Sequence, residues 1–339
     1  MKKTAKKTPE RFQTEKLLQA IREAAHVVLF AHISPDGDTI GSMLAFKILL
    51  EQIDKRVTMV VDGTVPENLF FLPGIEAIKK PRDIAAHIDM GAEGTLSVAL
   101  DVSSVDRMGL GAELFFQAPQ TAQIDHHETN PLYAAINVVD GSAPATAVLI
   151  FRLQQLLGLS VLTDAAICLY TALSTDTGNF VYEGANAEAF AMMSALMEAG
   201  LPLAKYSRLL FRRKERAFVA LLGKCLSSLT ILSNGEIAGI QVSQADIKAV
   251  GATAEHVDGV VDYAIDIAGI RMAYFARETE DGDIKFSLRA LTPFGVDQVA
   301  AQFNGGGHRL AAGCQLAPPM EEAVRIMQEA LIKAREGSL

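Results

Sequence analysis

The sequence contains no apolar run that approaches the roughly 18 residues needed to cross a bilayer. Its basic N-terminus, MKKTAKKTPERFQTEK, is not followed by the apolar core of a signal peptide. Only three cysteines are present, Cys168, Cys225 and Cys314, and they lie far apart. These shortages argue against a membrane protein, a disulfide framework and a zinc knuckle, and they favour the reducing cytoplasm.

Positive charge is also in short supply. Lysine and arginine number 31 against 40 aspartates and glutamates, which gives a formal net charge of −9. Tight binding to a long nucleic acid usually needs a broad basic face, because affinity rises with the number of phosphates neutralised. The composition therefore disfavours a long nucleic-acid partner. It leaves room for a short ligand held by a few arginines and by metal ions.

The length of 339 residues suggests two domains, at roughly 100–200 residues per domain. Apolar runs typical of strands buried on both faces occupy 27–31, 57–61, 96–100 and, more weakly, 121–124. Helical patterns occupy 39–52, 144–158, 163–175 and a stretch from Asn186 to just before Gly200. Strands that alternate with helices predict a parallel α/β sheet.

The pattern changes after residue 228. The pattern over residues 203–228 predicts one long helix. Two hairpins are predicted after it, the first with Asn234-Gly235 as a two-residue turn. Helices near 254–268 and 319–336 complete a smaller α+β unit with a mixed sheet. The predicted organisation is a flexible basic tail (1–14), a parallel-sheet domain (15–202), a linker helix (203–228) and the α+β domain (229–339).

Carboxylates and imidazoles follow three of the predicted parallel strands. They are His32, Asp36, Asp38, Asp101, Asp125, His126 and His127. Asp176 ends a predicted helix inside a polar run. The carboxyl ends of parallel strands meet at one edge of a sheet, where open α/β sheets bind their ligands. A single aspartate there is often only a helix cap, but several together would repel one another.

Lysine and arginine are scarce in these loops, and Arg107 is the nearest. Divalent cations would therefore be the simplest way to neutralise the negative charge. Oxygen and nitrogen ligands without thiolate favour Mn²⁺ or Mg²⁺ over structural zinc. Two such ions roughly 3.5–4 Å apart can activate a hydroxide and hold the oxygens of a phosphoryl group. We expect Gly37 and Gly41 to allow the tight turn that aims the aspartates inward. The sequence therefore predicts a two-metal phosphoryl-transfer site.

Five motifs, in this order, resemble those of the DHH family of phosphoesterases. They are HISPDGDTIGS (32–42), ALDVSSVDRMG (99–109), IDHHETN (124–130), STDTGNF (174–180) and FNGGGHRLAAG (303–313). The last is similar to the glycine-histidine motif of the family's C-terminal DHHA1 domain. The resemblance covers essentially the whole chain beyond the N-terminal tail. Within the family, the compact two-domain form resembles the bifunctional oligoribonucleases (nano-RNases) that also dephosphorylate 3′-phosphoadenosine 5′-phosphate (pAp).

The resemblance implies a role for each matching residue of the first domain. His32 and Asp36 would hold one metal ion, Asp38, His126 and Asp176 the other, and Asp101 both. His127 would contact the phosphate or support a ligand, and Asp125 would orient its neighbours. Arg107 could reach the scissile phosphate or form a surface salt bridge, and the sequence leaves both open.

The resemblance also implies a substrate-binding set in the second domain, with the active-site cleft between the two domains. The set is Arg289, Gly305, Gly306, Gly307 and His308. Independently of the family, three consecutive glycines allow backbone N–H groups to approach an anion closely. Arg289 could hold a phosphate through two hydrogen bonds. Taken alone, either feature could equally belong to an ordinary flexible loop or an exposed strand.

The favoured function is therefore a Mn²⁺-dependent phosphoesterase, with Mg²⁺ as the alternative ion. It would hydrolyse RNA oligonucleotides of about two to five residues to mononucleotides and dephosphorylate pAp. A phosphodiesterase for cyclic or linear dinucleotides is a close variant. An inorganic pyrophosphatase or exopolyphosphatase is disfavoured by the GGGH motif, and a non-catalytic nucleotide-binding regulator by the complete ligand set. A homodimer through apolar helices of the first domain is left open.

Overall fold

The structure, a computed structural model, describes residues 9–182, 184–257 and 259–337. It divides into two compact units after Arg213. In the described ranges no helix has the length and apolar character of a membrane span.

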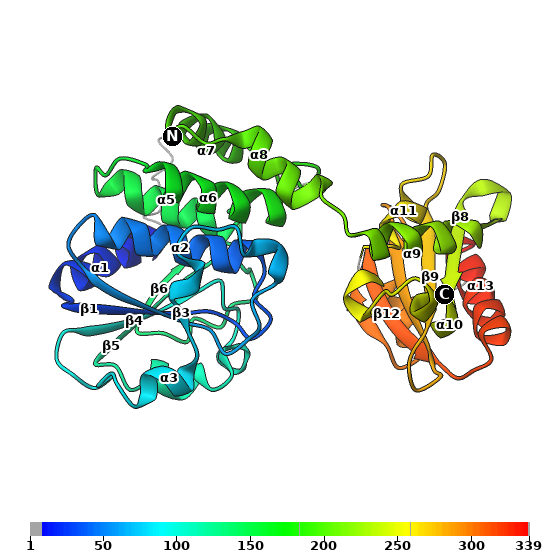
Figure 1. Cartoon of the computed structure of the whole chain (residues 1–339), viewed down its shortest axis with the longest axis horizontal. Coiled ribbons are helices and arrows are strands. Elements are labelled where there is room, and N and C mark those ends of the chain that lie inside the picture. The colour runs from blue at the N-terminus through cyan, green and yellow to red at the C-terminus, as the bar shows by residue number, and fades with distance from the viewer. Residues whose placement is uncertain (1–8, 183, 258, 338–339) are drawn as a thin grey trace, which may run out of the picture. The chain divides into compact units, whose positions relative to one another are not determined.

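The first unit is built on a six-stranded parallel sheet with the strand order β3-β2-β1-β4-β5-β6 (Figure 1). The strands are β1 (His26–Phe30), β2 (Arg56–Val60), β3 (Ile78–Lys79), β4 (Thr95–Leu100), β5 (Gln120–Asp125) and β6 (Ile136–Val139). This confirms the parallel α/β architecture and the four predicted strands. The edge strands β3 and β6 were not predicted.

Helices cover both faces of this sheet. The α-helices of the unit are α1 (Pro9–Glu23), α2 (Gly37–Glu51), α3 (Pro81–Ala85), α4 (Gly111–Phe115), α5 (Thr146–Leu156), α6 (Thr163–Asp176), α7 (Ala187–Glu198) and α8 (Leu203–Ser207). Short helical turns are η1 (Glu67–Leu69), η2 (Ile75–Ala77), η3 (Val105–Met108) and the π-type η4 (Arg208–Arg212).

The run of apolar residues in β1 shows why its sequence lacks alternation. Val27 and Leu29 pack with α1, α2, α5 and α6 on one face. Val28 and Phe30 pack with Ile84 and other side chains on the opposite face. Every position of β1 is therefore buried, as expected for a central parallel strand.

The second unit has a mixed sheet with the order β11-β12-β10-β9-β8-β7. Its strands are β7 (Thr230–Leu232), β8 (Ile237–Val242), β9 (Met272–Glu278), β10 (Ile284–Ala290), β11 (Gly306–His308) and β12 (Ala311–Leu316). Among the strands described for this unit, β8 and β9 pair in parallel and the other neighbours pair antiparallel. Its helices are α9 (Arg216–Ser227), α10 (Gln244–Ala249), α11 (Asp262–Ile265), α12 (Asp297–Ala301) and α13 (Met320–Arg335), with the turns η5 (Ser233–Gly235) and η6 (Ala254–Val257).

Four sequence-based expectations need correction. The helix predicted over 203–228 is broken, because residues 213–215 are extended or irregular between η4 and α9. The first hairpin exists, but four residues connect its strands, since Leu232 lies opposite Ile237. The helix predicted near 254–268 is two short pieces, η6 and α11.

The fourth correction concerns the N-terminal tail. Residues 9–14 of the predicted tail belong to α1, and the side chain of Gln13 accepts a hydrogen bond from the backbone N–H of Asn137 at 2.7 Å. Residues 1–8 lie outside the described residues. The expected flexible segment therefore does not extend to residue 14.

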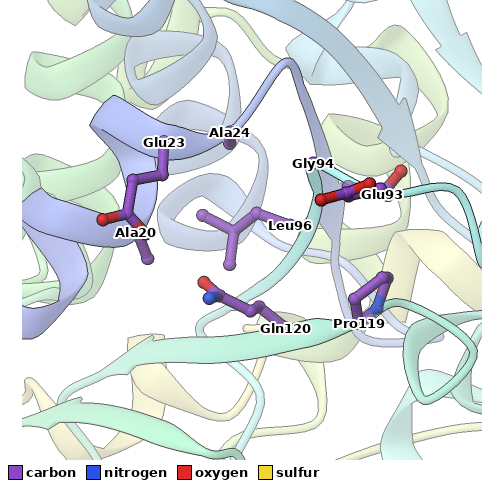
Figure 2. A pocket seen from close by; sticks show the side chains of 9 residues that line it. Ala20, Glu23, Ala24, Glu93, Gly94, Leu96, Pro119 and Gln120 are labelled. Atoms are coloured by element: carbon purple, nitrogen blue, oxygen red, sulfur yellow. The ribbon is translucent and has the colours of Figure 1, made fainter.

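A pocket of about 250 Å³ lies at the amino end of the parallel strands (Figure 2). Thr95 and Gln120, which begin β4 and β5, help to line it together with Glu23 and Glu93. The side chains that the sequence singles out follow the opposite ends of these strands. This pocket is therefore separate from the predicted site.

Candidate metal centre

Strand order brings the predicted site residues of the first unit to one edge of the sheet. The strands β1, β4 and β5 are neighbours, and His32, Asp101 and His126 follow their carboxyl ends. Asp36 caps the start of α2 by accepting a hydrogen bond from the N–H of Thr39 at 3.0 Å. Asp176 is the last residue of α6. The expected convergence of strand ends is confirmed as a feature of the fold.

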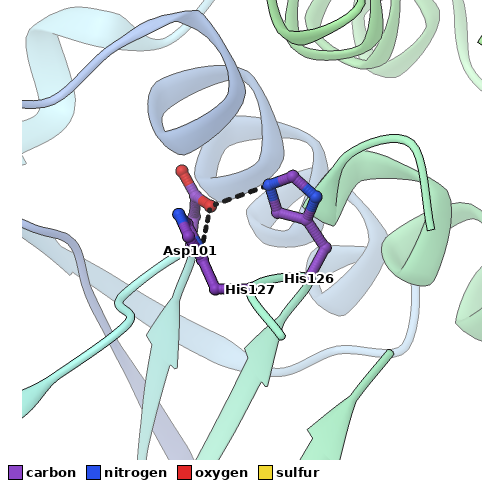
Figure 3. A group of neighbouring side chains, drawn as sticks. All are labelled: Asp101, His126 and His127. Atoms are coloured by element: carbon purple, nitrogen blue, oxygen red, sulfur yellow. Dashed lines mark ion pairs between the residues drawn. The ribbon is translucent and has the colours of Figure 1, made fainter. Parts of the chain in front are cut away.

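Asp101 lies at the centre of this arrangement. Its Oδ1 is 3.7 Å from Nε2 of His126 and 3.7 Å from Nδ1 of His127, whose rings approach from the end of β5 (Figure 3). Its Oδ2 is 3.8 Å from Nε2 of His32. The residue is 3% exposed and has a φ of 57°, which is an uncommon, strained conformation for aspartate. The fold therefore holds this carboxylate in place against both desolvation and backbone strain.

Two threonines of neighbouring helices fix the Asp101 carboxylate. The hydroxyl of Thr39 donates to Oδ2 at 2.6 Å and also lies 2.6 Å from Nε2 of His32. The hydroxyl of Thr146 donates to Oδ1 at 3.2 Å. Burial, and then the charges of Asp38 and Asp36, raise the pKa of Asp101 well above its ordinary value. Burial and the neighbouring carboxylates thus both oppose ionisation of this group.

Asp38 is buried at the start of α2. Its oxygens accept hydrogen bonds from the hydroxyl of Ser42 at 2.9 Å and from the backbone N–H groups of Thr146 and Ala147 at 2.6 and 3.1 Å. Burial nevertheless raises the pKa of Asp38. Burial and the Asp38 charge raise the pKa of Asp176 to about 6. The fold thus gathers carboxylates that mutually oppose ionisation.

The predicted ligands fall into groups that could hold metal ions. In each group one ligand atom per residue lies within 4.8 Å of the others. The groups are His32, Asp36 and Asp101; Asp38, His126 and Asp176; and Asp101, His126 and His127. The first two are the two sets expected from the sequence, and Asp101 lies beside His126 of the second. Carboxylate oxygens and imidazole nitrogens grouped in this way, with Asp38 and Asp101 buried, suit divalent cations.

Asp125 lies behind the centre rather than in it. It is fully buried and accepts hydrogen bonds from Nδ1 of His127 at 2.7 Å and from the side chain of Asn130. Burial alone would raise the pKa of Asp125, but these donors outweigh it, and the pKa lies below its usual value. The same hydrogen bond raises the pKa of His127. The pair therefore fixes the His127 ring with Nε2 as its free nitrogen.

Arg107 lies beside the first group of ligands. Its guanidinium is 3.4 Å from Nδ1 of His32, and its backbone carbonyl accepts a hydrogen bond from the N–H of Ile33 at 2.7 Å. The structure thus places Arg107 at the predicted site, where its charge lowers the pKa of His32 after the larger effect of burial.

The role expected for Gly37 and Gly41 is wrong. Both lie inside α2 and have helical backbone conformations, so neither forms a tight turn. A Cβ at Gly37 would collide with the side chain of Thr175, and one at Gly41 would lie 2.5 Å from the carbonyl oxygen of Cys168. These glycines let α2 and α6 pack closely. Their packing brings Asp38 and Asp176 together.

Two of the residues predicted in the second unit, Arg289 and His308, lie on one face of its sheet. Ala311 of β12 pairs with Arg289 of β10 on one side and with His308 of β11 on the other. Side chains in one such row project from the same face, and adjacent strands are about 4.7–4.9 Å apart. Nε of Arg289 donates to Asp262 of α11 at 3.0 Å, while His308 is exposed.

The three glycines differ in their conformational needs. Gly307 has a φ of 145°. A Cβ at Gly305 would collide with the carbonyl oxygen of Gly313. Gly306, in contrast, has open space around the position of a Cβ. Two of the three glycines are thus required by the local backbone, whatever the segment binds.

Sequence reasoning did not single out several residues that support these groups. They are Thr39, Asn130, Thr146 and Asp262. Thr39 and Asn130 stand inside two of the quoted motifs. Thr146 and Asp262 carry no local signal, because only the tertiary structure brings them to their partners.

Comparisons with known proteins agree with this architecture. The model of the DHH family, N-terminal domain, matches residues 26–173, and that of the DHHA1 domain matches residues 239–334. The chain belongs to the DHH family and carries a DHHA1 domain, which confirms the resemblance seen in the sequence.

Three relatives match almost the whole chain. A bifunctional oligoribonuclease and PAP phosphatase NrnA of Thermus thermophilus is 30% identical over 91% of this chain and 90% of its own. The Bacillus subtilis protein of the same name is 25% identical, and the match covers 94% of this chain and 99% of that protein. The crystal structure of an exopolyphosphatase-related protein from Bacteroides fragilis superposes with a TM-score of 0.86 at 28% identity, covering 97% of this chain and 98% of that one.

Proposed function

We propose that the chain is a metal-dependent phosphoesterase that hydrolyses RNA oligonucleotides of about two to five residues and removes a phosphate from pAp. The observation that carries this proposal is the set of carboxylates and imidazoles grouped around the buried Asp101. The names of the Thermus and Bacillus relatives support the choice of substrates.

His32, Asp36 and Asp101 would hold one metal ion, and Asp38, His126 and Asp176 would hold the other. Such ions, Mn²⁺ in the proposal and Mg²⁺ as its alternative, lower the pKa of water and stabilise charge on phosphoryl oxygens. The mixture of carboxylate and imidazole ligands favours manganese over magnesium.

The chain's own residues have distinct tasks in this proposal. Asp125 fixes the imidazole of His127, which can donate a hydrogen bond from Nε2 to a phosphate oxygen. The guanidinium of Arg107 adds positive charge beside His32. In the second unit, Arg289, His308 and the backbone of 305–307 would bind the other end of the substrate. A short substrate agrees with the acidic net charge.

A second candidate is hydrolysis of inorganic pyrophosphate or polyphosphate. The description of the Bacteroides structure as exopolyphosphatase-related favours it. Cyclic and linear dinucleotides form a third substrate class, since their phosphodiester presents the same group to the same residues. The proposal includes a cytoplasmic location, which three unpaired, buried cysteines support. It also leaves the homodimer as an alternative to a monomer.

One panel of substrates tests the proposal. Purified protein is incubated with Mn²⁺ or Mg²⁺ and with pApA, a labelled RNA length ladder, pAp, a cyclic dinucleotide, pyrophosphate or polyphosphate. We expect mononucleotides from the short RNAs and phosphate from pAp, with higher rates in Mn²⁺. Turnover of pyrophosphate or polyphosphate alone would replace the proposal with the second candidate. No turnover of any substrate would favour a nucleotide-binding regulator.

A further inference from the structure

The segment that follows Asp176 contains three consecutive residues with left-handed backbone conformations. Gly178, Asn179 and Phe180 have φ values of 56°, 57° and 68°. Glycine and asparagine tolerate this region, but a bulky aromatic residue does so only under strain. Strain of this kind persists where the surrounding structure enforces it, and it concentrates at functional sites.

Local contacts do enforce this turn. The N–H of Asn179 donates to the carbonyl of Ser174 at 2.6 Å, and the N–H of Phe180 donates to the hydroxyl of Thr177 at 3.2 Å. The ring of Phe180 packs on that of Phe190 in α7, with centroids 5.3 Å apart. The turn is therefore a defined structure anchored to α6 and α7.

The turn holds the ring of Tyr182 over Gly178, which follows the expected metal ligand Asp176 by two residues. The N–H of Tyr182 donates to the carbonyl of Thr177 at 3.1 Å, and its ring covers Gly178, where a Cβ would lie 2.5 Å from Cζ. Tyr182 is nevertheless 61% exposed. Gly178 is two residues from Asp176. The fold thus holds an aromatic ring in water, next to a residue expected to bind metal, instead of burying the ring in the core.

A second exposed apolar side chain belongs to the residue after another expected metal ligand. Ile33 directly follows His32 and is 45% exposed. The metal-binding groups themselves are polar and need no apolar neighbours in solvent. Exposed aromatic and aliphatic side chains beside a phosphate site do suit the flat, apolar face of a nucleobase, which stacks on such rings with little dependence on sequence.

We infer that Tyr182 is a stacking platform for the nucleobase adjacent to the phosphate under attack. The inference rests on the proposed function and deepens it, because it assigns recognition of a base to the first unit. The enzyme would then distinguish nucleotides from phosphate compounds without a base, before the second unit contributes. Stacking needs the aromatic ring and not its hydroxyl.

Two substitutions separate stacking from simple cover of the strained turn. Tyr182→Phe keeps the ring, whereas Tyr182→Leu keeps an apolar side chain of similar bulk without it. Phe116→Ala is the matched control, because Phe116 is another exposed aromatic residue of the same unit, at the end of α4 just before β5 begins. Melting temperature and bound manganese are measured for each variant, so that loss of folding or of metal is detected separately.

Kinetics on pAp and on ribose 3,5-bisphosphate, which lacks the adenine, provide the decisive readout. We expect Tyr182→Leu to raise KM for pAp about tenfold with little change in kcat, and to leave the kinetics on the bisphosphate unchanged. Tyr182→Phe and Phe116→Ala should resemble the unmodified protein.

Three outcomes would overturn the inference. These are an unchanged KM for pAp in Tyr182→Leu, an equal rise for both substrates, or a loss of manganese that accounts for the effect. In each case pAp turnover by the unmodified protein would leave the proposed function standing. An unmodified protein that hydrolyses neither pAp nor short RNA would instead overturn the proposed function, and the inference with it.

Discussion

Asp101 is expected to hold metal ions and Arg289 a substrate phosphate, and the fold holds these two side chains in different ways. Asp101 is 3% exposed, has a left-handed backbone conformation and receives hydrogen bonds from two threonines. The side chain of Arg289 is 32% exposed, and its guanidinium pairs with one partly exposed aspartate. The first residue is locked in place by the core, and the second is held at the surface.

This difference follows from the sign of the charges. Carboxylates that must share a small volume repel one another, so only a rigid scaffold can assemble them before metal binds. A lone arginine or histidine that awaits an anion meets no such repulsion, and exposure keeps it solvated. We therefore expect changes to the ligands of the metal centre to alter metal binding and kcat, and changes to Arg289 or His308 in the second unit to alter KM.

The largest effect is expected from Asp101→Ala. Loss of a carboxylate shared by the ligand groups should lower kcat by more than the roughly 10–100-fold that is typical when an outer partner of a ligand is removed. Asp125→Asn, which alters such an outer partner, is the matched control and should fall within that range. Activity on pAp and bound manganese are measured together. A near-normal rate for Asp101→Ala would contradict the assigned centre.

Glycine-to-alanine substitutions in two helices should have opposite effects on stability. Gly41→Ala in α2 should destabilise the fold by about 1–3 kcal/mol, because its Cβ would press on the backbone of α6. Gly223→Ala in α9 has open space and should stabilise the fold by up to about 1 kcal/mol through helix propensity.

Thermal unfolding of both variants checks this pair. Gly41→Ala should also bind manganese more weakly, since Asp38 and Asp176 depend on the spacing of α2 and α6. If both alanines stabilise the protein equally, close packing of these helices is not what positions the carboxylates.

In the second unit, His308→Ala should raise KM for short substrates about tenfold, the effect of losing one hydrogen bond to a charged group. Bound manganese and kcat should change little, because His308 lies outside the groups of metal ligands. Steady-state kinetics with elemental analysis measure this separation. Loss of bound manganese in this variant would mean that His308 does not act in substrate binding alone.

The contrast also explains what the sequence could predict. Buried strands and their polar ends leave a strong local pattern, so β1, β4 and β5 and the residues after them were predicted with nearly correct bounds. Short edge strands such as β3 and β11 leave little pattern, because two or three residues show no periodicity. The break after Arg212 contains neither glycine nor proline, so nothing in the sequence marks it.

The roles of Gly37 and Gly41 and the position of Tyr182 depend on tertiary packing, which the sequence pattern does not reveal. The sequence placed Gly37 and Gly41 beside the aspartates, but only the approach of α6 reveals why they lack side chains. The motif STDTGNF pointed to Asp176 and gave no indication that the next turn carries Tyr182 over Gly178. Local patterns thus identified the charged groups, whereas the devices that position them depend on contacts distant in sequence.

The raised pKa of Asp176, about 6 against an ordinary 3.8, gives a pH-dependent prediction for the metal-free protein. The folded state binds this proton more tightly than the unfolded state, so stability falls as pH rises from about 4 through 6. Asp176→Asn replaces the carboxyl with an amide that does not ionise, so this variant should not lose that stability as pH rises. In EDTA, its melting temperature should exceed that of the unmodified protein at pH 7, and the gain should shrink toward pH 4. Excess Mn²⁺ should abolish the gain, because bound metal stabilises the carboxylate form. A gain that persists in manganese would mean that Asp176 does not bind metal.

The smallest effect should come from releasing Arg289. Asp262→Asn weakens an ion pair of a kind worth about 0.2–1 kcal/mol, and the freed guanidinium should bind substrate phosphate more readily. KM should fall about twofold, with kcat and melting temperature nearly unchanged.

Asp266→Asn removes the same charge at the end of α11 and serves as the control for general electrostatics. An equal fall in both variants would show that net charge, and not the pairing of Arg289, controls affinity. A rise in KM in Asp262→Asn alone would mean that the ion pair orients Arg289 for binding, so that this surface is preorganised much as the metal centre is.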